Sequence, residues 1–155
     1  MTRFEQGALM RPGAAGDLGA AVRIVDQAYA PYVARLGKRP GPMLDDDARC
    51  LAARQLWVVE LQSQAVGVLV LEDAGDALLI EDVAIYPAVQ GSGLGTLCLG
   101  FAAQEAQHRK RAALRLYTNA AMTENIAFSV RHGFVETLRG THRGFDRVFM
   151  AKAVL

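Results

Sequence analysis

The stretch from Leu78 to Ala106 constrains the fold more than any other part of this chain. It begins with an apolar, β-rich segment that ends at Pro87, and it continues through a loop that contains Gly91, Gly93 and Gly95. After the loop, apolar residues recur at three- and four-residue spacing, as on one face of a helix. The order therefore predicts a strand, a glycine-rich loop and an amphipathic helix.

The glycine-rich loop has the properties of a phosphate site. Glycines let the backbone approach a ligand closely and direct its N–H groups outward, and a helix that begins there adds the positive end of its dipole. A dinucleotide fold would require Gly-x-Gly-x-x-Gly after the first strand, whereas here the spacing is Gly-x-Gly-x-Gly and lies past mid-chain. A nucleotide triphosphatase loop would require Gly-Lys-Ser/Thr, and Gly95-Thr96 has no lysine. A tight turn without a ligand stays open as an alternative.

The residues Gln90-Gly91-Ser92-Gly93-Leu94-Gly95 match the Gln/Arg-x-x-Gly-x-Gly/Ala signature of the GNAT acetyltransferase superfamily. The preceding strand ends Val83-Ala84-Ile85-Tyr86-Pro87, and Asn125-Ile126-Ala127-Phe128 and Gly133-Phe134 resemble the last helix of that family and the start of the strand after it. The resemblance spans most of the chain. It implies one α/β domain over residues 1–155, with a mixed, mostly antiparallel sheet flanked by helices. The sheet is expected to splay between the parallel strands 78–85 and 114–118.

Other elements follow from periodicity and breaker residues. Apolar positions at steps of three and four after Asp17 predict a helix, and Pro31 predicts its end near Tyr29 or Ala30, before a second short turn or helix over 32–36. Asp45 to Asp47 predict the start of a helix that reaches about Arg54. The remaining predicted strands are 9–11, 56–61, 65–71, 134–138 and 145–151, and the remaining predicted helices are 93–108 and 123–132.

Length and composition favour one globular domain. The chain has 155 residues, of which 52% are hydrophobic and 21% charged, and its net charge is +1. We therefore expect neither nucleic acid nor an anionic membrane as partner. No apolar segment has the length of a membrane span or of a signal peptide, so we expect a cytoplasmic protein. Cys50 and Cys98 are expected to be free buried thiols, and the scattered histidines predict no metal site.

The resemblance implies acetyl-CoA as the cofactor. In GNAT enzymes the pantetheine arm pairs with the strand before the loop, which assigns that role to the backbones of Val83 and Ile85, with the Val83 N–H as candidate oxyanion donor. Asn125 matches a family position near the cofactor, and Asn119 at the end of a strand could also reach the cofactor. Equally good alternatives are a turn residue for Asn119 and a helix-start residue for Asn125. The cofactor's pyrophosphate would lie on the loop residues Gln90, Gly91, Ser92, Gly93, Leu94 and Gly95.

Acetyl transfer to an amine requires the removal of one proton and the delivery of another. An alkyl ammonium has a pKa near 10, so it must be deprotonated before attack. Glu81 is the candidate base, because strand alternation places it on the face of Val83, whereas Asp82 faces the other way unless a bulge exchanges them. A solvated or paired strand carboxylate is the alternative for either. Many GNAT enzymes protonate the departing thiolate with a tyrosine where this chain has Ser129, a much weaker acid.

The resemblance implies an N-acetyltransferase that acts by direct attack of a primary amine, carried by a small molecule or a peptide, on acetyl-CoA. A CoA-binding regulatory or structural module with weak or no activity is the alternative, because of Ser129. The apolar C-terminal strand is compatible with a homodimer. Tyr29 and Tyr32 could equally be packing residues, since they continue the buried helical face. The residues expected near the acceptor are Tyr29, Tyr32, Arg35, Met43 and Arg147.

Overall fold

The computed structural model describes residues 2–4, 7–39 and 46–155. They form two compact units, Met1–Leu71 with Asp82–Cys98, and Glu72–Glu81 with Leu99–Leu155. The first is called the N-terminal unit below and the second the C-terminal unit. Two strands, β4 (Gln64–Ala74) and β5 (Ala77–Ile85), and one helix, α3 (Leu94–His108), contribute residues to both units.

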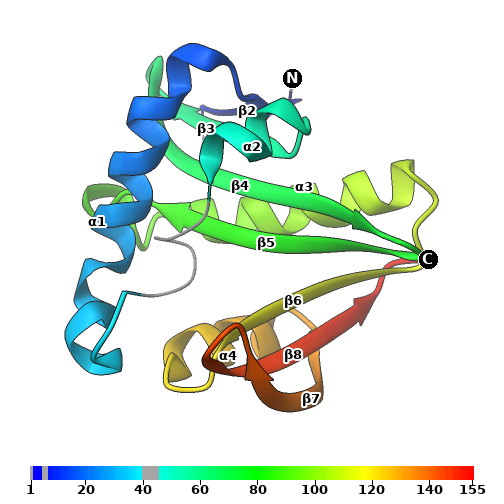
Figure 1. The fold of residues 1–155 in the computed structure, drawn as a ribbon. Coiled ribbons are helices and arrows are strands. Elements are labelled where there is room, and N and C mark those ends of the chain that lie inside the picture. The colour runs from blue at the N-terminus through cyan, green and yellow to red at the C-terminus, as the bar shows by residue number, and fades with distance from the viewer. Residues whose placement is uncertain (1, 5–6, 40–45) are drawn as a thin grey trace. The chain divides into compact units, whose positions relative to one another are not determined.

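The N-terminal unit is built on antiparallel strands. β1 (Thr2–Arg3) pairs with β2 (Ala8–Pro12), β2 pairs with β3 (Leu56–Leu61), and β3 pairs with β4 (Gln64–Ala74), whose last three residues belong to the C-terminal unit. Met10, Val58 and Val59 are almost fully buried in this sheet. The helices α1 (Leu18–Leu36) and α2 (Asp47–Ala52) lie on the same side of strands β2 to β4 (Figure 1).

Helix α1 corrects two expectations. The predicted break at Pro31 is wrong, because α1 runs without interruption over 19 residues and contains Pro31. A proline inside a helix costs about 3 kcal/mol, and here tertiary packing on the N-terminal side of Pro31 outweighs it. Val22, which the spacing placed on the buried face, is 48% exposed. The buried face instead consists of Ala21, Ile24, Val25 and Tyr29.

The second helix and the first hairpin agree closely with the sequence. α2 begins after Asp46, whose carboxylate accepts a hydrogen bond from the Arg49 N–H at 3.1 Å, and it ends at Ala52, two residues before the predicted end. Asp45 lies outside the described residues. β3 has the predicted bounds, and β4 is longer than predicted at both ends. Gln62 and Ser63 turn the hairpin, both with positive φ, as a two-residue turn requires.

The C-terminal unit contains the parallel strand pair. β5 pairs in parallel with β6 (Ala113–Asn119) from Ala77 to Ile80, and β6 pairs in antiparallel orientation with β8 (Phe145–Ala153) along its whole length. β7 (Val135–His142) lies on the other side of β8 and is four residues longer at its end than predicted. The turn between β7 and β8 uses Arg143 and Gly144, both with positive φ.

The sheet of the C-terminal unit has two different faces. Leu114, Leu116, Val148 and Met150 are buried on the side of α4 (Thr123–Arg131), which runs along β6 and β8 in Figure 1. Because paired residues share a face, the opposite face carries Tyr117 with Phe149 and Asn119 with Arg147.

The predicted fold class is confirmed. The sheet is mixed and mostly antiparallel, helices flank it, and a parallel pair joins the strand before the glycine-rich loop to the strand after α3. In the described part of the chain, none of the helices is long and apolar enough to span a bilayer.

Candidate active site

The glycine-rich loop lies between β5 and α3, as the sequence predicted. After β5, a short 3-10 turn at Pro87–Val89 leads to Gly91 and Gly93, whose φ angles are +82° and +87°. Residues with a side chain rarely adopt such φ angles, which explains why both positions are occupied by glycine. A Cβ at either position would have no atom within 4 Å, so the surface over the loop backbone is open. Gly95 differs, because it lies inside α3.

Side chains of the loop fix its shape. Gln90 Nε2 donates a hydrogen bond to the Ile85 carbonyl at 3.0 Å, and the Ser92 hydroxyl donates to the Val89 carbonyl. The first N–H groups of α3 have no acceptor within the helix, as at any helix start, and the Leu97 N–H closes the first turn on the Gly93 carbonyl at 3.1 Å. Gln90 and Ser92 therefore shape the loop through their side chains, a role that the signature alone did not predict.

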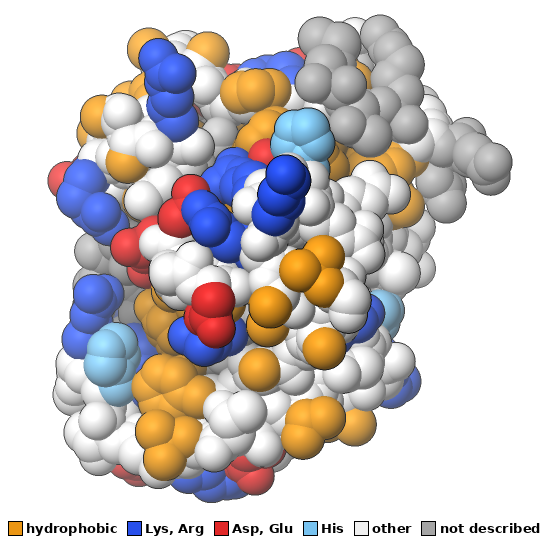
Figure 2. All heavy atoms as spheres, turned by 90° about the vertical axis from the view of Figure 1, so that its right-hand side faces the viewer, with side chains coloured by type: hydrophobic (Ala, Val, Ile, Leu, Met, Phe, Trp, Pro, Cys, Tyr) orange, Lys and Arg blue, Asp and Glu red, His pale blue; other side chains and the backbone are white. Residues whose placement is uncertain are grey.

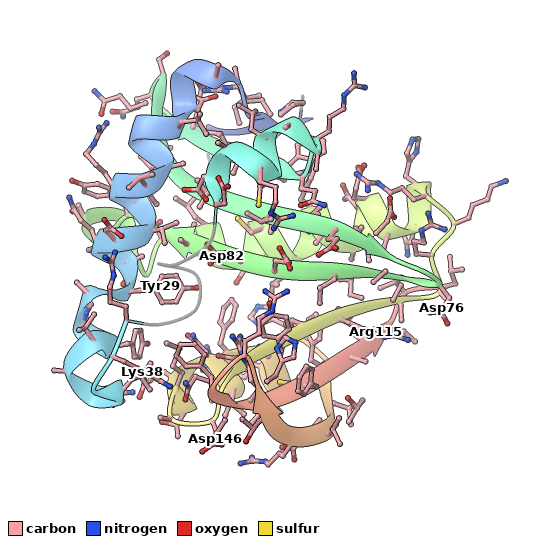
Figure 3. The ribbon with its side chains drawn as sticks, viewed as in Figure 1. Tyr29, Lys38, Asp76, Asp82, Arg115 and Asp146 are labelled. Atoms are coloured by element: carbon pink, nitrogen blue, oxygen red, sulfur yellow. The ribbon has the colours of Figure 1, made fainter. Side chains whose placement is uncertain are left out.

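The end of β5 carries a buried carboxylate that sequence reasoning did not assign to the site. Asp82 is 5% exposed, and the Tyr29 hydroxyl of α1 donates a hydrogen bond of 2.7 Å to its Oδ1. The same hydroxyl lies 3.3 Å from the Val83 carbonyl, within hydrogen-bonding distance. Figure 3 shows the Tyr29 ring directed toward Asp82. No sequence signal links these residues, because they lie 53 positions apart.

The burial along β5 follows the expected alternation without a bulge. Ile80, Asp82 and Ala84 are buried, whereas Glu81 and Val83 are half-buried. Glu81 therefore shares a face with Val83, as proposed from the sequence, and Asp82 faces away from them.

The neighbouring strand β4 supports the end of β5 through a glycine. A Cβ at Gly67 would lie 2.8 Å from Ile85 Cδ1 and 3.2 Å from the Ala84 carbonyl oxygen, so only glycine fits there without a shift. The Tyr86 N–H also donates to the Val66 carbonyl at 2.8 Å. A glycine inside a strand pattern is the signal that would have indicated this close approach.

The candidate residues of α4 and of the preceding turn are hydrogen-bonded within the C-terminal unit. The Ser129 hydroxyl, which is almost fully buried, donates to the Asn125 carbonyl at 2.9 Å. Asn125 Nδ2 lies 3.5 Å from Met122 Sδ. Asn119 Oδ1 accepts a bond from the Ala121 N–H at 2.9 Å, as in an Asx turn. The proposed contacts of Asn119 and Asn125 with the cofactor stay predictions.

The residues predicted near the acceptor lie in both units. In α1, Arg35 stacks on Tyr32 with 5.1 Å between its Cζ and the ring centroid, and Tyr32 packs against Tyr29. In β8, Arg147 is 6% exposed and lies over the Tyr117 ring at 4.4 Å. Met43 lies outside the described residues.

The two cysteines are buried and free. Loss of hydration in the interior raises the pKa of the Cys98 thiol to about 12, so this thiol is a poor nucleophile at neutral pH. Over the residues that the structure describes, no cluster of histidine, cysteine, aspartate and glutamate has the grouping of a metal site.

The basic cluster after α3 is neutralised by acidic side chains. Asp73 accepts ion pairs from Arg109 at 3.3 Å and Arg111 at 3.1 Å, and Arg109 also pairs with Glu105 at 3.0 Å. In Figure 2, lysine and arginine side chains are interspersed with acidic ones on the face shown. Arg109 and Arg111, which follow α3, are therefore ion-paired.

Comparison with known proteins agrees with this geometry. A family model described as an acetyltransferase (GNAT) domain matches residues 52–136, which include the glycine-rich loop and α4. A search of curated protein sequences finds no match.

Several solved structures share the fold. The ribosomal-protein-alanine N-acetyltransferase of Brucella melitensis is 24% identical, with a TM-score of 0.74 over 94% of this chain and 99% of that chain. The PaiA N-acetyltransferase of Thermoplasma acidophilum, solved with coenzyme A, is 14% identical, with a TM-score of 0.78 over 94% and 98%. A GNAT family acetyltransferase of Elizabethkingia anophelis with acetyl-CoA bound is 13% identical, with a TM-score of 0.69 over 96% and 99%. Because the family model covers more than half of the sequence, this chain belongs to the GNAT acetyltransferase family, whose cofactor is acetyl-CoA.

Proposed function

We propose that this protein transfers the acetyl group of acetyl-CoA to the primary amine of a small molecule or peptide, by direct attack. The observation that carries the proposal is the open loop after β5. Gly91 and Gly93 have the left-handed backbone and no neighbouring atom where a side chain would be, and α3 begins directly after them. Such a loop suits the pyrophosphate of CoA, because its N–H groups and the helix dipole favour an anion.

The proposed roles follow the strand and the loop. When bound, acetyl-CoA supplies the activated acetyl group as a thioester. The backbones of Val83 and Ile85 would hold the pantetheine arm as an added strand, and the Val83 N–H would stabilise the oxyanion. Glu81, half-buried on the Val83 face, would remove the proton of the acceptor ammonium, directly or through water. Neither cysteine supports a covalent intermediate, since both are buried.

One observation favours a second candidate, a CoA-binding module with weak or no catalytic activity. The Ser129 hydroxyl has a single proton, and this proton is already donated to the Asn125 carbonyl. Ser129 is therefore badly placed to protonate a departing thiolate. A thiol with a pKa near 8.5 leaves without an acid at a reduced rate, since general acid catalysis contributes roughly 10²- to 10⁴-fold.

Thermal melts with acetyl-CoA, dephospho-CoA and NAD test the proposed cofactor site. A ligand at a hundred times its Kd stabilises a protein by about 2.7 kcal/mol, so acetyl-CoA should raise the Tm clearly and NAD should not. Gly93→Ala should lose this shift. Gly75→Ala is the matched control, because Gly75 has a similar φ of +72° and equally open surroundings in the β4–β5 turn. Both variants carry the strain of a left-handed alanine, about 1–2 kcal/mol, but only Gly93→Ala should lose the response.

Three outcomes separate the candidates. A shift with acetyl-CoA, followed by release of free thiol with at least one primary amine, supports the transferase. A shift without turnover on a broad amine panel supports the binding module. The absence of a shift with acetyl-CoA, or a shift with NAD instead, contradicts the assignment of the loop.

A further inference from the structure

One tyrosine of α1 contacts both the side chain and the backbone at the end of β5. The Tyr29 hydroxyl donates to Asp82 Oδ1 at 2.7 Å and lies 3.3 Å from the Val83 carbonyl oxygen. Tyr29 is 9% exposed and Asp82 is 5% exposed, and all three residues belong to the N-terminal unit. The contact therefore joins a helix to a strand in the interior of a single unit.

The Val83 carbonyl lies on the edge of β5 that faces away from β4. The Tyr86 N–H donates to the Val66 carbonyl of β4, and the backbone groups of successive strand residues point to alternate edges. Because burial along β5 alternates without a bulge, the backbone groups of Val83 and Ile85 point to the edge opposite β4. The pairing of β5 with β6 covers Ala77 to Ile80 and ends before these residues. Val83 and Ile85 thus form the edge along which the pantetheine arm is proposed to lie.

Both peptide groups that flank Val83 are held by the Tyr29 hydroxyl. The N–H of Val83 belongs to the peptide group that begins at Asp82, whose side chain accepts the short bond from Tyr29. The carbonyl of Val83 belongs to the next peptide group and lies within hydrogen-bonding distance of the same hydroxyl. One residue further along this edge, the Ile85 carbonyl accepts from Gln90 Nε2 at 3.0 Å. The direction of the Val83 N–H is therefore fixed from both sides.

A buried carboxylate is a costly way to pack a strand against a helix. Ile80 and Ala84, which lie on the same face of β5 as Asp82, are buried and apolar. An apolar side chain at position 82 would avoid the cost of removing a polar group from water. Asp82 instead provides a hydrogen bond, whose length and direction are restricted in a way that apolar contacts are not.

We propose that Tyr29 is a positioning residue, which acts through Asp82 and the Val83 backbone to align the Val83 N–H, the candidate oxyanion donor. The inference rests on the proposed acetyltransferase function and adds a residue to it. An oxyanion donor is effective at about 2.7–3.1 Å from the developing charge, and a misplacement of about 1 Å can cost roughly 10²-fold in rate. The bond between α1 and β5 sets this alignment before the cofactor binds.

Tyr29→Phe tests the alignment by kinetics. The variant keeps the ring and its packing, so it should fold. For an amine that the wild-type protein acetylates, kcat should fall roughly 10- to 100-fold, whereas the KM for acetyl-CoA should change little, because the ground-state contacts with the loop remain. The deficit in kcat should be the same at about pH 7 and about pH 10, since an aligning residue accepts no proton.

Two further variants separate alignment from packing. Asp82→Asn keeps an oxygen that can accept the bond from Tyr29, so this conservative variant should retain most of kcat. Tyr86→Phe is the matched control, because it removes a hydroxyl directly after the same strand. Among the described residues, the Tyr86 hydroxyl makes no hydrogen bond, so this variant should keep the wild-type kcat.

Nuclear magnetic resonance of the cofactor-free protein tests the alignment without turnover. The order parameter of the Val83 amide should be near 0.85 in the wild-type protein, the usual value for rigid backbone, and it should fall in Tyr29→Phe. It should not fall in Tyr86→Phe. The Ile85 amide is the internal reference, because Gln90 still holds the carbonyl of that residue in each variant.

The outcomes separate this inference from the proposed function. An unchanged Val83 order parameter in Tyr29→Phe overturns the inference whatever the kinetics. A kcat per folded molecule equal to that of the wild-type protein, or a deficit that shrinks toward pH 10, also overturns it, and each leaves the transferase standing. If no amine is acetylated, the proposed function fails and the order parameter alone decides: its fall in Tyr29→Phe supports alignment by Tyr29, and its constancy contradicts it.

Discussion

At the scale of single residues, the end of β5 shows how neighbouring carboxylates receive different environments. Strand alternation sends Asp82 to the side of α1, where it is buried and accepts a bond from Tyr29. Glu81 is only half-buried, on the face of the strand that would receive the cofactor's thioester. We therefore propose a structural role for Asp82, and we propose Glu81, the more accessible carboxylate, as the proton acceptor.

The replacement of each carboxylate by its amide separates these roles. Glu81→Gln should lower kcat/KM at neutral pH by about 10²- to 10⁴-fold, the usual contribution of a general base. The deficit should shrink as the pH approaches 10, because the free amine then becomes abundant without help from the enzyme. Asp82→Asn should instead lower the stability and leave the shape of the pH–rate profile unchanged. An unaltered profile in Glu81→Gln would remove Glu81 from the mechanism.

At the scale of elements, α1 shows packing overcoming local preference. Pro31 has no N–H, so the Gln27 carbonyl lacks its usual partner, and yet the helix continues to Leu36 and ends with Gly37 in the left-handed conformation. Pro31 itself is exposed and contributes little burial. The helix therefore carries a local energetic cost that its packed first half compensates.

Pro31→Ala should consequently stabilise the protein. Alanine restores the hydrogen bond and the helical preference, a gain of up to about 3 kcal/mol, reduced by roughly 1 kcal/mol because the unfolded chain becomes more flexible. Urea denaturation should show a higher midpoint with an unchanged m-value, and the far-ultraviolet circular dichroism should be unchanged or slightly more helical. A midpoint equal to or below that of the wild-type protein would contradict a net energetic cost of Pro31 in the helix.

At the scale of the whole molecule, the features that depend on adjacent residues were predictable from the sequence, whereas contacts between distant segments were not. The strand, loop and helix around Gly91 follow from adjacent residues, so their order was predictable, and the family signature then supplied the sheet around them. The Tyr29–Asp82 bond joins residues 53 positions apart, which no local pattern encodes. The glycine at position 67 inside a strand indicates a close approach, but not that Ile85 is the residue approached. The sequence did not predict that α1 continues through Pro31, because the burial of a helix face can outweigh the low helix propensity of a single residue. The catalytic and acceptor roles of single side chains remain predictions, because these roles depend on contacts between distant segments.

The stability of the whole molecule should depend on pH through one ion-pair network. Arg11 donates two bonds to the Asp17 carboxylate, at 2.7 and 2.8 Å, and one to Glu60 at 3.0 Å. Hydrogen bonding to Arg11 lowers the pKa of Asp17 below its ordinary value of 3.8, although partial burial opposes the shift. Because the folded pKa is the lower one, the network stabilises the fold fully above about pH 4 and loses this contribution as the pH falls through the folded pKa.

Asp17→Asn should therefore lower the free energy of unfolding by about 1–3 kcal/mol at pH 7, as expected for hydrogen bonds to a partly buried charged group. The difference from the wild-type protein should narrow as the pH falls below 4, since protonation then removes from wild-type Asp17 the charge that the variant already lacks. Urea denaturation at pH 7 and at successive acidic values measures the difference. Asp26→Asn is the control, because Asp26 and its partner Arg39 are both exposed, and it should change stability by less than about 1 kcal/mol throughout. A gap between wild type and Asp17→Asn that stays constant into strong acid would show that Asp17 stabilises the fold by packing and not by its charge.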